Sequence, residues 1–167
     1  VGGLFRPMPL TAVCGIVGAL AISGFPLTSG FTTKTMISQA AADESLVELV
    51  ADRVVEWLEA WWTRYMREIG DLVQVVQMGD DLGGQDGPLF SPALYRRIFK
   101  PREARLIRIV RQHSQAKIYF HSCGAIREYI PDLIEIGVDA LNPVQVHARG
   151  MDSAALKKDF GREVGFW

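Results

Sequence analysis

Apolar residues follow a helical period in the first charged part of the chain. From Leu46 to Ile69 they recur at steps of three and four, which predicts a long amphipathic helix. We expect its apolar face to pack in a protein core, including the tryptophans Trp57, Trp61 and Trp62. Gly70 then ends the helix.

Short runs rich in strand-forming residues alternate with helical patterns after Gly70. The pattern predicts strands over residues 71–78, 117–120, 138–142 and 163–167. Helices are expected between them, from Ser91-Pro92 to about 112 with a pause at Pro101, and over 126–136 and 152–160. Such alternation predicts parallel strands that are neighbours in chain order, with helices packed on one side.

A polar loop follows each of the first three strands. These loops are Gly79-Asp80-Asp81, His121-Ser122-Cys123 and Asn142-Pro143-Val144-Gln145. The carboxyl ends of parallel strands meet at one edge, so the loops indicate part of the rim of a (β/α)8 barrel, and four strands make about half of one. A Rossmann-type sheet is the alternative, but no G-x-G-x-x-G follows the first strand.

The most informative motif is His121-Ser122-Cys123-Gly124. Side chains two apart on a strand point the same way, so His121 and Cys123 are expected to meet at the mouth of the strands, facing Asp81 and Gln145. Imidazole and thiolate are ligands that zinc prefers, but the sequence shows no obvious third ligand. A buried cysteine and a core histidine are the alternative interpretation.

Charge divides the chain into two unlike parts. Residues 1–42 contain only Arg6 and Lys34, whereas the other 16 basic residues and all 19 acidic residues follow. The apolar run within residues 10–33 predicts a membrane-type helix, about 20 residues being enough to span a bilayer. A signal peptide cleaved near Ala19-Leu20-Ala21 and a buried helix of a soluble protein are alternatives.

The composition of the whole chain bears on its binding partners and its cellular setting. The net charge of -1 and the pI near 6.3 give no reason to expect nucleic acid as a partner. The two cysteines, Cys14 and Cys123, suggest no disulfide framework, so we expect a reducing, cytoplasmic setting for the barrel part. Membrane association is expected only through residues 10–33.

The stretch from about residue 47 to 167 resembles the uroporphyrinogen decarboxylase superfamily, which includes the cobamide-dependent methyltransferases. The resemblance rests on seven blocks in order: Gly79-Asp80-Asp81-Leu82-Gly83, Gln85-x-Gly87-Pro88-Leu89, Ser91-Pro92-x-x-Tyr95, Lys100-Pro101-Arg102, Phe120-His121-Ser122-Cys123-Gly124, Ile130-Pro131-Asp132-Leu133-Ile134 and Leu141-Asn142-Pro143-Val144-Gln145. It implies the C-terminal half of a (β/α)8 barrel.

The His-x-Cys turn resembles the methyltransferase side of that superfamily. The resemblance implies that His121 and Cys123 bind zinc together with a later cysteine, which would fall beyond Trp167. Zinc would hold a small-molecule thiol that accepts a methyl group from a corrinoid, carried by a partner protein. The alternative is a decarboxylase acting on a porphyrinogen without a metal, whose catalytic Asp and Arg lie in N-terminal motifs that this chain lacks.

Acids and amides in the same blocks are the remaining candidate site residues. Asp80 and Asp81 are candidate catalytic residues, although acids in glycine-rich loops are also common in simple turns, as at Asp86. Gln85, Asn142 and Gln145 are candidate substrate-binding residues.

Residues 1–46 resemble something unrelated, the proton-pumping subunits of multisubunit sodium/proton antiporters and respiratory complex I. The matching residues are Met8-Pro9-Leu10-Thr11, residues 18–27, Gly30-Phe31 and Lys34. The resemblance implies that Lys34 corresponds to a lysine on the ion path, and an interfacial anchor is the alternative. We expect a fragment in which an antiporter-like piece has been joined to a barrel piece by fusion or artefact.

Overall fold

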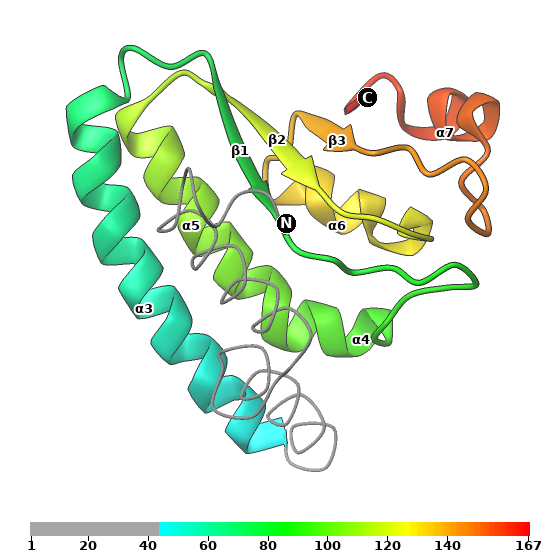
Figure 1. The fold of residues 1–167 in the computed structure, drawn as a ribbon, viewed down its shortest axis with the longest axis horizontal. Helices are drawn as coiled ribbons and strands as arrows, with labels where there is room; N and C mark the ends of the chain where they lie inside the picture. Colours follow the sequence, from blue (N-terminus) through cyan, green and yellow to red (C-terminus); the bar gives the residue numbers. More distant parts are fainter. Residues whose placement is uncertain (1–43) are drawn as a thin grey trace, which may run out of the picture. The chain divides into compact units, whose positions relative to one another are not determined.

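The computed structural model describes residues 44–167, and the chain divides into two units, residues 1–50 and 51–167. The second unit carries the sheet and the candidate site. Its strands are β1 (Val75–Gly79), β2 (Lys117–His121), β3 (Ala140–Asn142) and β4 (Gly165–Phe166). The helices of the described chain are α3 (Glu44–Ile69), α4 (Pro92–Leu94), α5 (Lys100–His113), α6 (Ile130–Glu135) and α7 (Ser153–Phe160), with a π turn at Tyr95–Phe99 and a 3-10 turn at Arg127–Tyr129 (Figure 1).

The strands form one parallel sheet in the order β1-β2-β3-β4. Gly79 pairs with His121 across β1 and β2, and His121 pairs with Asn142 across β2 and β3. The predictions of parallel strands and of chain order are confirmed. A parallel sheet of four strands alternating with helices is consistent with half of a TIM-type barrel.

The two faces of the sheet have different surroundings. On one face the side chains are buried, and they join a cluster with residues of α5, α6 and α7: Val76, Ile118, Phe120, Leu141, Ile107, Val110, Leu133 and Leu156. Burial of one such side chain stabilises a fold by about 1.5–3 kcal/mol. On the other face Val75, Gln77 and Lys117 are exposed.

The helical stretch that leads into α5 begins, and changes its winding, where the sequence predicts. The Ser91 hydroxyl accepts a hydrogen bond from the Leu94 backbone N–H at 3.2 Å, as expected of an N-cap. The predicted pause at Pro101 is a π turn over Tyr95–Phe99, immediately before it. Proline lacks the N–H that would bond the Arg97 carbonyl, and its ring crowds that carbonyl, so a wider turn is favoured there.

Two of the three tryptophans of α3 are exposed to solvent instead of packed in the core. Trp57 and Trp61 are 66% and 45% exposed, so the prediction that they pack in the core is wrong. The buried residues of this helix are Val55 and Met66, and Trp62 is partly buried against the core. The face with Trp57 and Trp61 and the face with Val55 and Met66 both follow a helical spacing. Only packing against the rest of the unit decides which face is buried.

Helix α5 lies beside α3, and ion pairs join the two (Figure 1). The Arg102 guanidinium lies 2.8 Å from the Asp52 carboxylate, and that of Arg105 lies 2.6 Å from Glu59. Within residues 44–167 no helix combines the length and apolar character needed to cross a bilayer. The predicted membrane segment, residues 10–33, lies outside the described residues.

Asp139 joins two strands at the end of the sheet away from the candidate site. Its carboxylate accepts hydrogen bonds from the Ile118 backbone N–H at 2.7 Å and from the Lys117 amine at 3.0 Å, and it pairs with Arg111. We expect Asp139→Ala to lower the free energy of unfolding by about 2 kcal/mol, because a half-buried charged acceptor is lost. Asp139→Asn, which keeps one acceptor, should cost less. Urea denaturation of both variants tests this, and equal losses would contradict it.

Candidate metal centre

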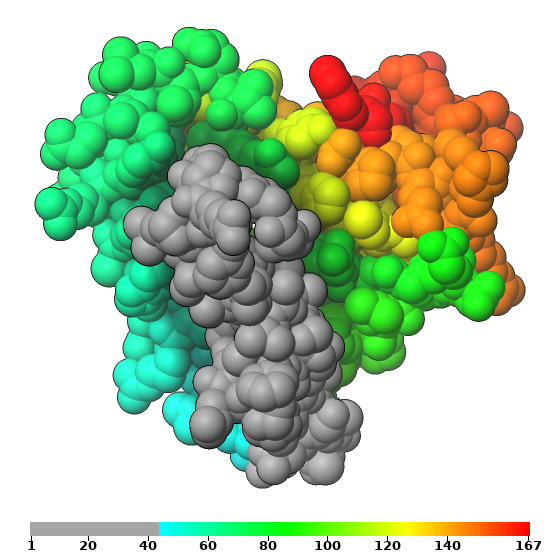
Figure 2. Space-filling model, viewed as in Figure 1, coloured from blue at the N-terminus to red at the C-terminus, as the bar shows by residue number. Residues whose placement is uncertain are grey.

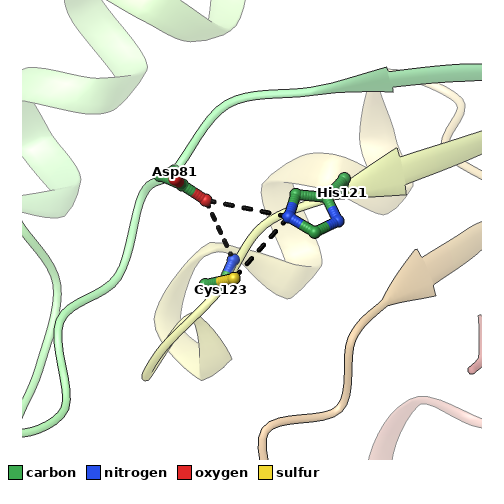
Figure 3. Close-up of side chains that lie close together, drawn as sticks. All are labelled: Asp81, His121 and Cys123. Atoms are coloured by element: carbon green, nitrogen blue, oxygen red, sulfur yellow. Dashed lines mark hydrogen bonds and ion pairs between the residues drawn. The ribbon is translucent and has the colours of Figure 1, made fainter. Parts of the chain in front are cut away.

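Three potential metal ligands meet where β1 and β2 end (Figure 3). The Nε2 atom of His121 lies 3.6 Å from the Sγ atom of Cys123 and 4.0 Å from Oδ1 of Asp81. One ligand atom from each residue lies within 4.8 Å of the other two. Asp81 therefore supplies a third candidate donor, which the sequence pattern alone does not identify.

Strand register explains why these residues meet. His121 is the last residue of β2, and Cys123 follows it by two positions. Gly79, the last residue of β1, pairs directly with His121, so the chain leaves β1 beside it and reaches Asp81 two residues later. The expectation that Asp81 faces the same space as His121 and Cys123 is confirmed.

Two glycines let the loops after β1 and β2 approach closely. Gly124 has a φ of +80°, and a Cβ atom added to it would collide with the backbone of Gly83. A Cβ atom added to Gly83 would lie 2.7 Å from the Ala125 nitrogen and 2.8 Å from the Cys123 carbonyl oxygen. The close contact between the loops therefore requires glycine on both sides.

Ser122 joins the loops after β1 and β2 by a hydrogen bond on their buried side. Its hydroxyl accepts a hydrogen bond from the Leu82 backbone N–H at 3.0 Å, and both residues are buried. The sequence pattern alone does not identify this role of Ser122. The available signal was its place between two outward-facing residues, which directs its side chain to the opposite face.

Further hydrogen bonds hold the ligand turn from the β3 side. The Gly124 backbone N–H donates to the Gln145 side-chain oxygen at 2.8 Å. From the β1 side, the Cys123 backbone N–H donates to Oδ1 of Asp81 at 3.3 Å. Nδ1 of His121 lies 2.8 Å from the side-chain oxygen of Asn142. Asn142 and Gln145 thus lie at this site, where they contact protein groups.

The donor set fits zinc. Tetrahedral zinc with bonds of about 2.3 Å to sulfur and about 2.05 Å to nitrogen places those two atoms about 3.5 Å apart. The observed separation between Sγ of Cys123 and Nε2 of His121 is 3.6 Å. The distance from Nε2 to the Asp81 oxygen, 4.0 Å, exceeds the roughly 3.4 Å expected for such a pair, a difference that rotation of an exposed carboxylate can remove.

An open hollow lies in front of the ligands. It is lined by Gln77, Met78, Gly79, Asp80, Asp81 and His121. The pKa of Asp80 is raised, mainly because desolvation at the end of β1 disfavours its charged form. The negative charge of neighbouring Asp81 raises this pKa further, although part of Asp80 is exposed. The side chains of His121 and Asp81 are 40% and 68% exposed, so an external molecule can reach them.

Two acidic or amide candidates lie away from the ligands. Gln85 and Asp86 are exposed in the loop after β1, which the Gly83–Pro88 bridge closes. The backbone carbonyl of Gln85 accepts a hydrogen bond from the Arg149 N–H at 2.9 Å. This contact places the green loop against the orange segment that follows β3 (Figure 2). The structure does not bring Gln85 or Asp86 to the three ligands.

Part of the chain is similar to proteins named NADH-ubiquinone oxidoreductase chain 5. It is 49% identical to NADH-ubiquinone oxidoreductase chain 5 of Bos indicus over 41 residues, which are 25% of this chain and 7% of that protein. The protein of the same name from Dictyostelium discoideum is 32% identical over 65 residues, which are 39% of this chain and 10% of that protein. The chain thus spans a tenth or less of the length of these relatives. This similarity agrees with the resemblance of residues 1–46 to a proton-pumping subunit.

The larger similarity covers strands β1 to β3 and the candidate metal centre. The sequence model of the family described as "Uroporphyrinogen decarboxylase (URO-D)" matches residues 26–158. No solved structure matches the chain. The match includes the loop that carries Asp81 and the turn that carries His121 and Cys123, as the sequence blocks predicted. The chain belongs to the uroporphyrinogen decarboxylase family.

Proposed function

We propose that this chain is part of a zinc-dependent methyltransferase that moves a methyl group from a corrinoid to a thiol. One observation carries the proposal: a carboxylate, an imidazole and a thiol lie within 4.8 Å of one another at the carboxyl ends of parallel strands. Barrel enzymes gather their chemistry at that end. A decarboxylase acting on a porphyrinogen would have no use for this donor set.

The architecture we propose is the C-terminal half of a (β/α)8 barrel. The parallel order of four strands with intervening helices supports it. We propose a boundary near residue 46, with an apolar, membrane-type segment before the barrel part of residues 47–167. The family match begins earlier, at residue 26, so the two similarities are not cleanly separated along the chain.

Each residue has a role in this proposal. Nε2 of His121, the Cys123 thiolate and the Asp81 carboxylate would hold the ion, and their open side would leave a position for the substrate. Bound zinc supplies one effect, which is to favour the deprotonated form of a thiol. Asp80 lines the same hollow and would receive the proton that the thiol releases.

The methyl donor and the N-terminal segment rest on resemblance. We propose the corrinoid, and a partner protein that carries it, because the His-x-Cys turn resembles the methyltransferase side of the superfamily. Membrane association through residues 10–33 is proposed on the similarity to NADH-ubiquinone oxidoreductase chain 5. The matched length is too short to support a proposal of proton pumping.

Zinc content tests the proposed function. We expect the wild-type chain to bind one zinc ion, and His121→Ala or Cys123→Ser to abolish this binding, because each removes one of three donors. Asp81→Asn should weaken it. His147→Ala and Cys14→Ser are matched controls that remove the same groups elsewhere and should retain the metal.

Activity assays of the complete enzyme distinguish methyl transfer from decarboxylation. Thiol methylation should be lost together with zinc in the His121→Ala and Cys123→Ser variants. Porphyrinogen decarboxylation by metal-free enzyme, unchanged by these substitutions, would refute the methyltransferase proposal.

A further inference from the structure

At the carboxyl end of the sheet, β1, β2 and β3 each contribute one residue to a row across the strands. Gly79 of β1 pairs with His121 of β2, which pairs with Asn142 of β3. Residues in register on adjacent strands project to the same face, so His121 stands between a glycine and an asparagine. The ring of His121 therefore has a side-chain neighbour in this row only on the β3 side.

The contact with Asn142 determines which ring nitrogen carries the proton. Nδ1 of His121 lies 2.8 Å from Oδ1 of Asn142, and a carbonyl oxygen can only accept a hydrogen bond. Nδ1 must therefore be the donor. In the neutral ring this leaves the Nε2 lone pair free, and Nε2 is the atom that faces Cys123 at 3.6 Å and Asp81 at 4.0 Å.

Gly79 keeps the opposite side of His121 clear. A Cβ atom added to Gly79 would lie 2.8 Å from the Cβ atom of His121 and would collide with the His121 carbonyl oxygen. No side chain fits there without displacing the strands. Asn142 is accordingly the residue of the row that can fix the orientation of the ring.

We propose that Asn142 is a positioning residue that holds His121 in the Nδ1–H tautomer with Nε2 directed at the ligand cluster. The inference rests on the proposed function only for the identity of the metal. A hydrogen bond to the second ring nitrogen is what fixes the tautomer of a metal-binding histidine, and losing it typically lowers metal affinity about 10–100-fold. Here the acceptor is an amide, and it comes from the neighbouring strand.

Nitrogen NMR of the metal-free chain tests the tautomer directly. At a pH where the ring is neutral, the His121 spectrum should show a protonated Nδ1 in the wild type. In Asn142→Ala it should shift towards the mixture typical of a solvent-exposed histidine. His113 and His147 are internal references, and Gln74→Ala, which removes an exposed amide at the other end of β1, is the control.

Metal affinity provides the second measurement. We expect Asn142→Ala to weaken zinc binding about 10-fold or more, and Asn142→Asp to restore it because a carboxylate accepts the same hydrogen bond. A wild-type spectrum with protonated Nε2, or an unchanged spectrum in Asn142→Ala, would overturn the inference. If the wild type shows the Nδ1–H tautomer but binds no zinc, the proposed function fails and the role of Asn142 stands.

Discussion

Replacement of Gly124 by alanine is expected to lower the free energy of unfolding by about 3 kcal/mol. A left-handed residue with a Cβ atom costs about 1–2 kcal/mol, and overpacking in a close contact adds about 1–3 kcal/mol. Both apply, because Gly124 has a φ of +80° and its added Cβ atom would meet the Gly83 backbone. The loops should separate, which would move Asp81 away from Cys123 and weaken zinc binding.

Gly150 offers a matched control for Gly124. It has a φ of +77°, but an added Cβ atom would meet only the Arg127 side chain, at 3.5 and 3.9 Å. Gly150→Ala should therefore show the conformational cost alone, about 1–2 kcal/mol, with zinc binding unchanged. Urea denaturation and zinc titration of both variants measure the difference. Equal losses of stability would contradict a role for close loop packing.

A second large effect is expected at Glu103, a carboxyl buried between α5 and the π turn. Glu103 is 6% exposed, and its Oε2 accepts a hydrogen bond of 2.5 Å from the Tyr95 hydroxyl. Its Oε1 has no hydrogen-bond partner among the residues that the structure describes. Desolvation dominates and raises the pKa of Glu103 from 4.5 to about 7, although the Tyr95 hydrogen bond opposes the rise.

This shift makes stability depend on pH. Between pH 4.5 and about 7 the folded chain keeps a proton on Glu103 that the unfolded chain releases. The free energy of unfolding should therefore fall as pH rises through this window, by about 3 kcal/mol in total for this group. The stability associated with the neutral carboxyl is complete below pH 4.5 and is lost above about pH 7.

Glu103→Gln should remove that dependence. Glutamine stays neutral and still offers an oxygen to the Tyr95 hydroxyl, so we expect the variant to be more stable than the wild type at pH 8 and similar to it at pH 4.5. Urea denaturation across this range measures the effect. Glu163→Gln, at an exposed position, should leave the wild-type curve unchanged. Parallel curves for wild type and Glu103→Gln would show that Glu103 is ionised in the folded chain at neutral pH.

The sheet and part of the site were predictable because they depend on local patterns. Strand and helix periods, with Ser91, Gly137 and Gly161 at helix ends, are enough to indicate parallel strands. Alternation along one strand likewise predicts that His121 and Cys123 share a face.

Features that depend on the packing of separate segments could not be predicted. The Gly83–Gly124 contact and the Ser122 hydrogen bond join loops about 40 residues apart, and the sequence carries no period that links them. The contact between Asn142 and His121 requires the register of β2 against β3. The exposed side of α3 depends in the same way on which of two apolar stripes meets the rest of the unit.

The three ligands come from two segments of the chain, since Asp81 follows β1 whereas His121 and Cys123 end β2. An ion held by all three would act as a reversible crosslink between these segments. The unfolded chain keeps only the local His-x-Cys pair, so it binds the ion more weakly than the folded chain. Metal concentration then becomes a determinant of folding. Free zinc at 100 times its dissociation constant would raise the free energy of unfolding by at most about 2.7 kcal/mol, because binding to the unfolded chain subtracts from this value. Zinc supply to this chain would thus govern how much folded protein persists as well as its chemistry.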